Sequence, residues 1–304
     1  MNKPDAIEQL ARELELHPDY KVLRRLQPRR SFAGWDGEED VLQVVVVDTE
    51  TTGLNADKDE IIEIGLVVVA VGATSGQAFE VLDSYGALEE PSGPIPPETT
   101  LVHGITDEMV VGQRIDDLRV QAMLKNVGLV VAHNAGFDRR FLERRLPVFA
   151  ELPWACSVKD VAWCEEGFGS QKLDYLLMQC GFFHEAHRAE ADCLALLEVL
   201  QRPLAKASGV AMTQLLRAAN QKRYRIWAVN SPFEVKDDLK AMGYRWDAVM
   251  RCWKLETSED ALEEELLRLK LLAYPKRPAK ISVEVLDARV RFSDRPGIRE
   301  ERVL

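Results

Sequence analysis

Apolar residues occur in short runs through the middle of the chain, and these runs predict alternating strands and helices. The run at 44–47 consists of four valines, which is typical of a strand buried on both faces. Further elements are expected as strands at 61–71, 78–85 and 130–133, and as helices after residues 134 and 190. This pattern predicts an α/β domain whose mixed sheet is covered by helices.

A new pattern of apolar residues begins after Pro203, where the second helix is expected to end. The later elements are expected as a strand at 225–229, a helix at 234–242, a hairpin at 244–255, a helix at 261–272 and a final strand or hairpin at 281–292. Near the start of the chain, Ile7, Leu10 and Leu14 share one face of an expected helix. We therefore divide the chain into an N-terminal helical extension (1–40), the α/β domain (41–206) and a smaller C-terminal α+β domain (207–304).

Two carboxylates follow the valine run directly. Asp48 and Glu50 stand at positions i and i+2 of the expected strand, so both side chains point to the same side. Like charges this close are costly unless a cation lies between them, and a hard divalent ion such as Mg²⁺ or Mn²⁺ prefers oxygen ligands. A chance Asp-x-Glu in a solvated turn is the alternative for this motif taken alone.

Two further motifs supply carboxylates in the same part of the chain. Asn134 is expected to cap a helix that carries Asp138 in its first turn, near the positive end that favours an ionised carboxylate. His187 and Asp192 converge only if His187 lies on a loop and Asp192 one turn inside the following helix. The alternative for Asp138 is that it only complements the helix dipole, as an acidic residue in the first turn of a helix commonly does. His184, just upstream, is interpreted as a structural or surface residue.

Taken in order, the three motifs resemble those of a known enzyme family. Asp48-Thr49-Glu50-Thr51-Thr52-Gly53, the segment from His133 to Asp138, and the segment from His187 to Asp192 are similar to the DEDDh (DnaQ-like) 3′–5′ exonucleases. That family includes the proofreading epsilon subunit of bacterial replicative polymerase, RNase T and oligoribonuclease. The resemblance covers roughly 41–202, includes a substrate-side segment at 102–106, and implies a ribonuclease H-like fold.

The resemblance also implies a set of functional residues. Two Mg²⁺ ions, for which Mn²⁺ can substitute, would be held by Asp48, Glu50, Asp138 and Asp192, and His187 would deprotonate the attacking water. Histidine suits that role because its ordinary pKa lies near 6.5. A metal pair supplies charge to both the attacking and the leaving oxygen. Contacts to the terminal nucleotide are expected from Thr51, Gly53, Leu54, His103, Asn134 and Phe137.

Composition sets the remaining limits. The net charge is −11, but residues 207–304 hold 19 Lys and Arg against 15 Asp and Glu, a net charge of +4, so residues 1–206 carry −15. Metal-binding carboxylates account for part of that acidity. No apolar stretch approaches membrane-spanning length, so we expect no membrane partner. Five cysteines without a Cys-x-x-Cys pair, together with a start that lacks a signal peptide, predict reduced thiols in a cytoplasmic protein.

Two segments outside the motifs admit more than one interpretation. The basic residues at 21–30 could contact a nucleic-acid backbone, although we favour a solvated face or an oligomer contact. Trp246 and Trp253, interleaved with Arg and Lys, loosely resemble the HARP-like modules of some DNA-remodelling helicases. The two rings either stack on single-stranded bases or form the core of a small domain.

The function expected from these features is a metal-dependent 3′–5′ exonuclease that releases nucleoside 5′-monophosphates. The 3′ end of single-stranded DNA is the expected substrate, and short RNA is the alternative, because one fold serves both. A non-catalytic polymerase or nucleic-acid docking module is a third interpretation, against which the presence of all five chemical residues argues. A polymerase or repair partner and the oligomeric state stay open.

Overall fold

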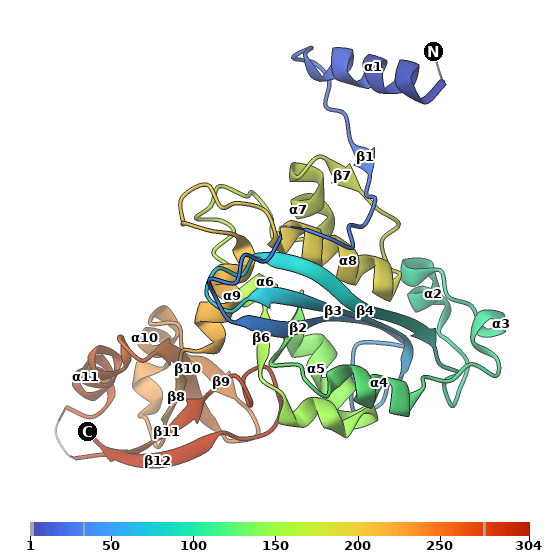
Figure 1. The fold of residues 1–304 in the computed structure, drawn as a ribbon. Coiled ribbons are helices and arrows are strands. Elements are labelled where there is room, and N and C mark those ends of the chain that lie inside the picture. Colours follow the sequence, from blue (N-terminus) through green and yellow to red (C-terminus); the bar gives the residue numbers. More distant parts are fainter. Residues whose placement is uncertain (1–2, 33, 276–277) are drawn as a thin grey trace.

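The computed structural model describes residues 3–32, 34–275 and 278–304, and this part of the chain contains two five-stranded sheets (Figure 1). In the first sheet the strands lie in the order β4-β3-β2-β5-β6, with β2 and β3 antiparallel and β2 and β5 parallel. Their bounds are β2 (Val41–Thr51), β3 (Ile61–Gly72), β4 (Ala78–Leu88), β5 (Leu129–Ala132) and β6 (Trp154–Cys156). The predicted mixed sheet is confirmed.

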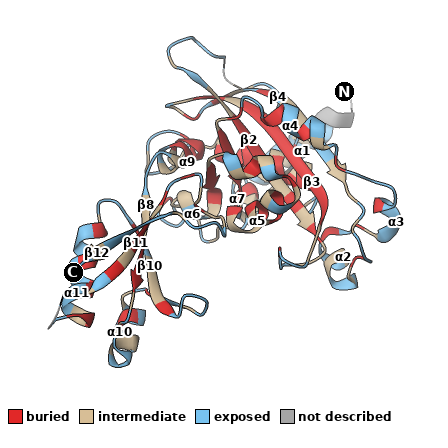
Figure 2. Cartoon of the chain, turned by 90° about the horizontal axis from the view of Figure 1, so that it is seen from below, coloured by how far each residue is buried: buried red, intermediate tan, exposed pale blue. Residues whose placement is uncertain are grey.

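Helices cover both faces of this sheet, as the unbroken valine run predicts. Val44 and Val46 pack into the core beneath α7 (Leu173–Gln179), α8 (Ala189–Leu200) and α9 (Ala211–Ala219). Val45 and Val47 pack into the opposite core with α4 (Asp117–Leu124) and α5 (Ala135–Arg145). Figure 1 shows α7 and α8 on one side of the sheet and α4 and α5 on the other, and Figure 2 shows the central strands buried. The shorter helices are α2 (Pro97–His103), α3 (Asp107–Val110), η1 (Pro147–Glu151) and α6 (Ser157–Asp160).

The second sheet forms a smaller α+β unit with its own core, as predicted. Its strands pair antiparallel in the order β12-β11-β8-β10-β9. The bounds are β8 (Arg223–Ala228), β9 (Arg245–Asp247), β10 (Cys252–Ser258), β11 (Lys280–Leu286) and β12 (Ile298–Val303), with η2 (Phe233–Val235), α10 (Lys236–Ala241) and α11 (Leu262–Ala273). Trp253 packs against this core, whereas Trp246 is 53% exposed. Trp253 therefore fits the interpretation as a core residue, whereas Trp246 is exposed enough for the interpretation as a base-stacking residue.

The final strand or hairpin predicted over 281–292 contains only the first of its strands. β11 stops at Leu286, and residues 287–297 leave the sheet to dock on the larger domain before β12 begins. Arg139, fully buried on α5, donates hydrogen bonds to the carbonyls of Ala288, Arg289 and Arg291. These contacts satisfy backbone carbonyls that a strand would otherwise pair, so the loop leaves the sheet without leaving these groups unpaired.

The predicted division after Lys206 falls before α9, although α9 packs into the larger domain. Met212 and Leu215 of α9 are completely buried in the core that α8 and the sheet share. The unit that folds around the first sheet therefore extends through Ala219.

The N-terminal extension contains a strand as well as the expected helix. After α1 (Lys3–Glu15), the short β1 (Arg24–Arg25) pairs in parallel with β7 (Phe182–Phe183). Several of the basic residues form ion pairs within the chain: Arg24 binds Glu8 and Glu15, Arg25 binds Glu185, and Arg29 binds the buried Glu198. These pairs favour an internal structural role over contact with a nucleic-acid backbone.

Within the described ranges, all five cysteines are unpaired thiols. Among the same residues, we find no helix with the length and apolar character needed to cross a membrane.

Candidate active site

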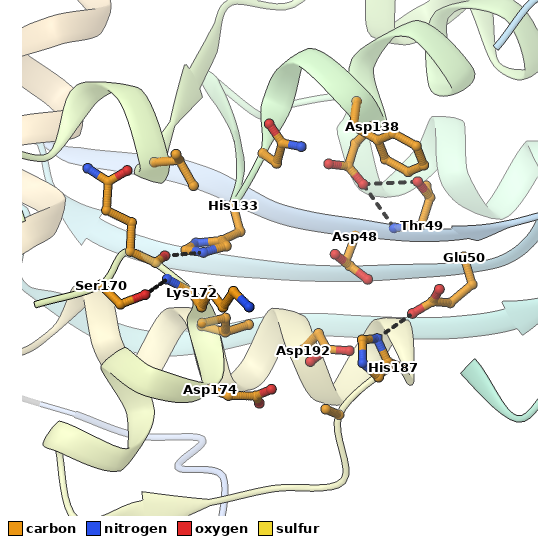
Figure 3. Close-up of a pocket in the computed structure, with 16 residues that line it drawn as sticks. Asp48, Thr49, Glu50, His133, Asp138, Ser170, Lys172, Asp174, His187 and Asp192 are labelled. Carbon is orange, nitrogen blue, oxygen red and sulfur yellow. Dashed lines mark hydrogen bonds and ion pairs between the residues drawn. The ribbon is translucent and has the colours of Figure 1, made fainter. Parts of the chain in front are cut away.

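Three carboxylates meet between the C-terminal end of β2 and the start of α8 (Figure 3). Asp48 and Glu50 point to the same side of β2, as their spacing predicts, and Asp192 comes from the first turn of α8. One oxygen from each of the three lies within 4.8 Å of the other two. An oxygen-only cluster of this size matches the ligand preference of hard divalent ions.

A glycine lets α8 approach the sheet closely enough to form this cluster. A Cβ atom on Gly65 of β3 would lie 2.2 Å from the carbonyl carbon of Ala189, the first residue of α8. Any larger residue would push the helix away. Arg188 fixes the same junction, because its guanidinium binds the buried Glu63 at 3.0 Å.

Asp138 lines the same cavity, and its hydrogen-bond donors come from Thr49 of β2. It is buried in the first turn of α5, and its Oδ1 accepts hydrogen bonds from the backbone N–H and the hydroxyl of Thr49. Burial nevertheless raises the pKa of Asp138 to about 7. Desolvation, the largest cause, thus opposes the ionised state that the helix end is predicted to favour.

The other carboxyls show the same effect more strongly. Burial, followed by the charges of Asp138, Asp192 and Glu50, raises the pKa of Asp48 well above its usual range. Burial, with Asp192 as the next cause, raises the pKa of Glu50 to about 8. Asp48 forms no salt bridge with any described residue. Only added positive charge would keep these groups ionised together at neutral pH.

The two histidines of the loop before α8 have different surroundings. His187 has a positive φ of 64°, its side chain is 51% exposed, and its Nδ1 lies 3.9 Å from Glu50 Oε1. The predicted loop position of His187 is thus confirmed. The side chain of His184 is only 6% exposed, and its Nε2 lies 2.6 Å from Asp192 Oδ1. The surface alternative for His184 is wrong; its spacing from Asp192 gives no signal of this contact.

The four carboxylates and His187, but not His184, line a cavity of about 720 Å³. Asn134 and Phe137 of the predicted substrate contacts lie in its wall, together with the segment from Ser170 to Asp174, which no sequence motif indicated. Asn134 holds the N-cap position of α5 without forming the side-chain cap that was predicted, which leaves its amide facing the cavity. His133 joins the wall to this segment by a 2.8 Å contact with the carbonyl of Gln171.

The other predicted substrate contacts lie outside the lining of this cavity. Thr51 donates a hydrogen bond to the carbonyl of Gly53, which stabilises the turn after β2. Leu54 is 84% exposed on that turn. His103 is buried, its Nδ1 accepts from the N–H of Ile105, and its Nε2 has no hydrogen-bond partner among the described residues.

Comparison with known proteins identifies the domain that carries this site. The family described as RNase_T exonuclease matches residues 45–200. The chain belongs to this exonuclease family. Its members hydrolyse phosphodiester bonds, and the larger domain is therefore a nuclease domain.

Two relatives and one solved structure are similar to parts of this chain. The chain is 32% identical over 170 residues to the DNA polymerase III subunit epsilon of Treponema pallidum, covering 52% of this chain and 74% of that protein. It is 31% identical over 208 residues to the PolC-type DNA polymerase III of Thermotoga petrophila, covering 66% of this chain but only 14% of the polymerase. Among solved structures it is similar to Exonuclease X in complex with 5′ overhanging duplex DNA, with 25% identity, a TM-score of 0.40, and coverage of 57% of this chain and 99% of that one.

Proposed function

We propose that the exonuclease domain removes nucleotides from the 3′ end of a single nucleic-acid strand, most readily DNA, and releases nucleoside 5′-monophosphates. The observation that carries this proposal is the cluster of Asp48, Glu50 and Asp192 in an open cavity, with Asp138 in the same wall. The 3′–5′ direction and the preference for DNA rest on similarity to the epsilon subunit.

The donor set fits divalent metal ions. Asp48, Glu50 and Asp192 offer carboxylate oxygens close to one another, and the raised pKa values of Asp48 and Glu50 call for a cation. Asp138 would complete the ligand set, in the arrangement that the motifs imply. Bound Mg²⁺ ions would supply positive charge to the attacking and leaving oxygens of the phosphodiester.

The protein's own groups would act around that centre. His187 is the proposed base, since its exposed ring lines the cavity beside Glu50 and can accept a proton from water there. His184 would orient Asp192 through its 2.6 Å contact, in the way that outer partners fix metal ligands. Asn134 and Phe137 would contact the terminal nucleotide from the cavity wall.

Matched, 5′-labelled DNA and RNA strands of one sequence test the proposal. We expect shortening from the 3′ end in the presence of Mg²⁺, faster on DNA, and none in excess EDTA or with Asp48→Ala. Asp260→Ala, which removes an exposed carboxylate from the C-terminal domain, is the control and should match wild type. Hydrolysis in EDTA or by Asp48→Ala would contradict the metal-dependent mechanism, and faster loss of RNA would reverse the substrate preference.

A further inference from the structure

A second cavity, of about 410 Å³, lies between the two domains beside the active site. We call it the interdomain groove. Five cationic side chains line it: Arg140, Lys159, Arg223, Arg225 and Arg291. Only two carboxylates, those of Glu256 and Asp294, lie among them. The lining side chains therefore carry a net positive charge, although Glu284 and Asp160 behind them pair with Arg225 and Arg291.

The groove continues directly from the active-site cavity. Asn134 lines both, and Val158 of the active-site wall is followed by Lys159 of the groove. Gly136, in the first turn of α5, also lines the groove, and a Cβ atom there would meet nothing within 4 Å. Open backbone at the positive end of a helix suits the close approach of an anion.

Two of the five cations are free to bind a ligand. Arg140 pairs with Asp294, Arg225 with Glu256 and Glu284, and Arg291 with Asp160. By contrast, Lys159 and Arg223 form no salt bridge or side-chain hydrogen bond within the described ranges. Lys159 comes from the exonuclease domain and Arg223 from β8 of the C-terminal domain, so a ligand between them would contact both domains.

The docked loop at 287–297 holds the two walls of the groove in place. Arg139 binds three of its carbonyls from α5, and the backbone N–H of Trp154 donates to the carbonyl of Ala288 at 2.7 Å. Ser293 adds a hydrogen bond to Glu143 at 2.6 Å. Contacts of this number fix the position of Arg223 relative to the active site before any ligand binds.

We infer that the interdomain groove binds the sugar–phosphate backbone of the substrate strand, with Lys159 and Arg223 contacting phosphates on the 5′ side of the bond that is cut. This inference rests on the proposed exonuclease function and extends it to the C-terminal domain. Phosphate is the ligand that matches the chemistry, because repeated negative charges next to a terminal nucleotide occur only along a nucleic-acid strand.

Binding of a labelled single strand of about 12 nucleotides in EDTA tests the inference without hydrolysis. The full-length double variant Lys159→Ala/Arg223→Ala should bind about tenfold more weakly. The slope of log affinity against log salt, measured between about 50 and 200 mM, should fall by about 1.4, or about 0.7 for each phosphate that is no longer neutralised. The matched control is Arg114→Ala/Lys125→Ala, which removes an exposed Arg and an exposed Lys beside α4, and it should bind as wild type.

A second experiment measures hydrolysis and distinguishes an effect on the groove from an effect on the active site. The double variant should lose at least about tenfold more kcat/KM on the longer strand than on a dinucleotide, which is too short to reach the groove. If the double variant has the same affinity and salt slope as the control, the inferred backbone binding by the groove is wrong, while the exonuclease function is unaffected. A wild-type protein that binds the strand but cuts neither substrate would instead overturn the proposed function. If the double variant fails to fold, Lys159→Gln and Arg223→Gln are measured singly, and two unchanged slopes overturn the inference.

Discussion

His184 Nε2 lies 2.6 Å from Asp192 Oδ1, and the second ring nitrogen lies 3.6 Å from Asp174 Oδ1. The Asp192 carboxylate also accepts the N–H of Arg188 through its other oxygen at 3.0 Å. Both oxygens of Asp192 are thereby held in place. A carboxylate with fixed orientation presents the same lone pairs to an ion each time one binds, which lowers the cost of binding.

We predict that His184→Ala lowers activity about 10–100-fold and raises the Mg²⁺ concentration needed for half-maximal rate. The reason is that Asp192 loses the partner that orients it. His184→Gln, which keeps a hydrogen-bond donor, should recover part of both losses. The measurement is the reaction rate as a function of Mg²⁺ concentration. If both variants follow the wild-type curve, His184 does not have this role.

His187→Ala should lower kcat by about 10²–10⁴-fold, because it removes the proposed base. Its half-saturating Mg²⁺ concentration should stay close to wild type, in contrast to His184→Ala. The acidic limb of the pH–rate profile should change as well. His17→Ala, an exposed histidine before β1, is the control; a comparable loss in that variant, or a small loss in His187→Ala, would remove His187 from the mechanism.

The free energy of unfolding should depend on pH and metal together. The pKa of Glu50 is raised to about 8 and that of Asp138 to about 7, so the folded protein binds protons that the unfolded chain releases near its ordinary carboxyl pKa values. Stability from these groups is present at low pH and is lost as pH rises toward 8.

Thermal unfolding in EDTA checks this: the melting temperature should fall between about pH 5 and pH 8. Excess Mg²⁺ should remove that fall, since bound cations stabilise the ionised carboxylates. The variant Asp48→Asn should show a smaller fall than wild type in EDTA, because one buried carboxyl with a raised pKa is gone. A melting temperature that rises with pH in EDTA would contradict the assigned pKa directions.

Arg139→Ala should lower the free energy of unfolding by about 3–5 kcal/mol, because it leaves Glu143 and three carbonyls without their buried partner. The neighbouring Arg140→Ala removes a more exposed pair with Asp294 and should cost no more than about 1 kcal/mol. Denaturant unfolding of the two variants measures both. A loss of no more than about 1 kcal/mol for Arg139→Ala would mean that its contacts with the docked loop contribute little to stability.

The two tryptophans of the C-terminal domain should respond differently to substitution. Trp253→Ala should destabilise the domain by about 3 kcal/mol, because this ring packs against its core. Trp246, exposed in a cavity with Phe233 and Lys236, is placed to stack on a base, so Trp246→Ala should weaken single-strand binding with little loss of stability. Unchanged binding by Trp246→Ala would remove base stacking from this cavity.

Much of the active site follows from the sequence because its spacing rules are local. The positions of Asp48 and Glu50 depend only on the two-residue repeat of a strand, and the side of α8 that bears Asp192 depends only on where that helix begins. The valine run likewise predicts a strand covered on both faces. These features need no information about distant parts of the chain.

The tertiary structure alone decided the rest, since it depends on residues far apart in sequence. Arg139 meets the carbonyl of Arg291 across 152 positions, and Lys159 shares a groove with Arg223 only because that contact docks one domain on the other. His184 lies close to Asp192 in sequence, but its role depends on a loop whose path is set by the contact between Arg188 and Glu63. Local periodicity carries no information about such contacts, because many chain paths satisfy it equally well and packing selects one of them.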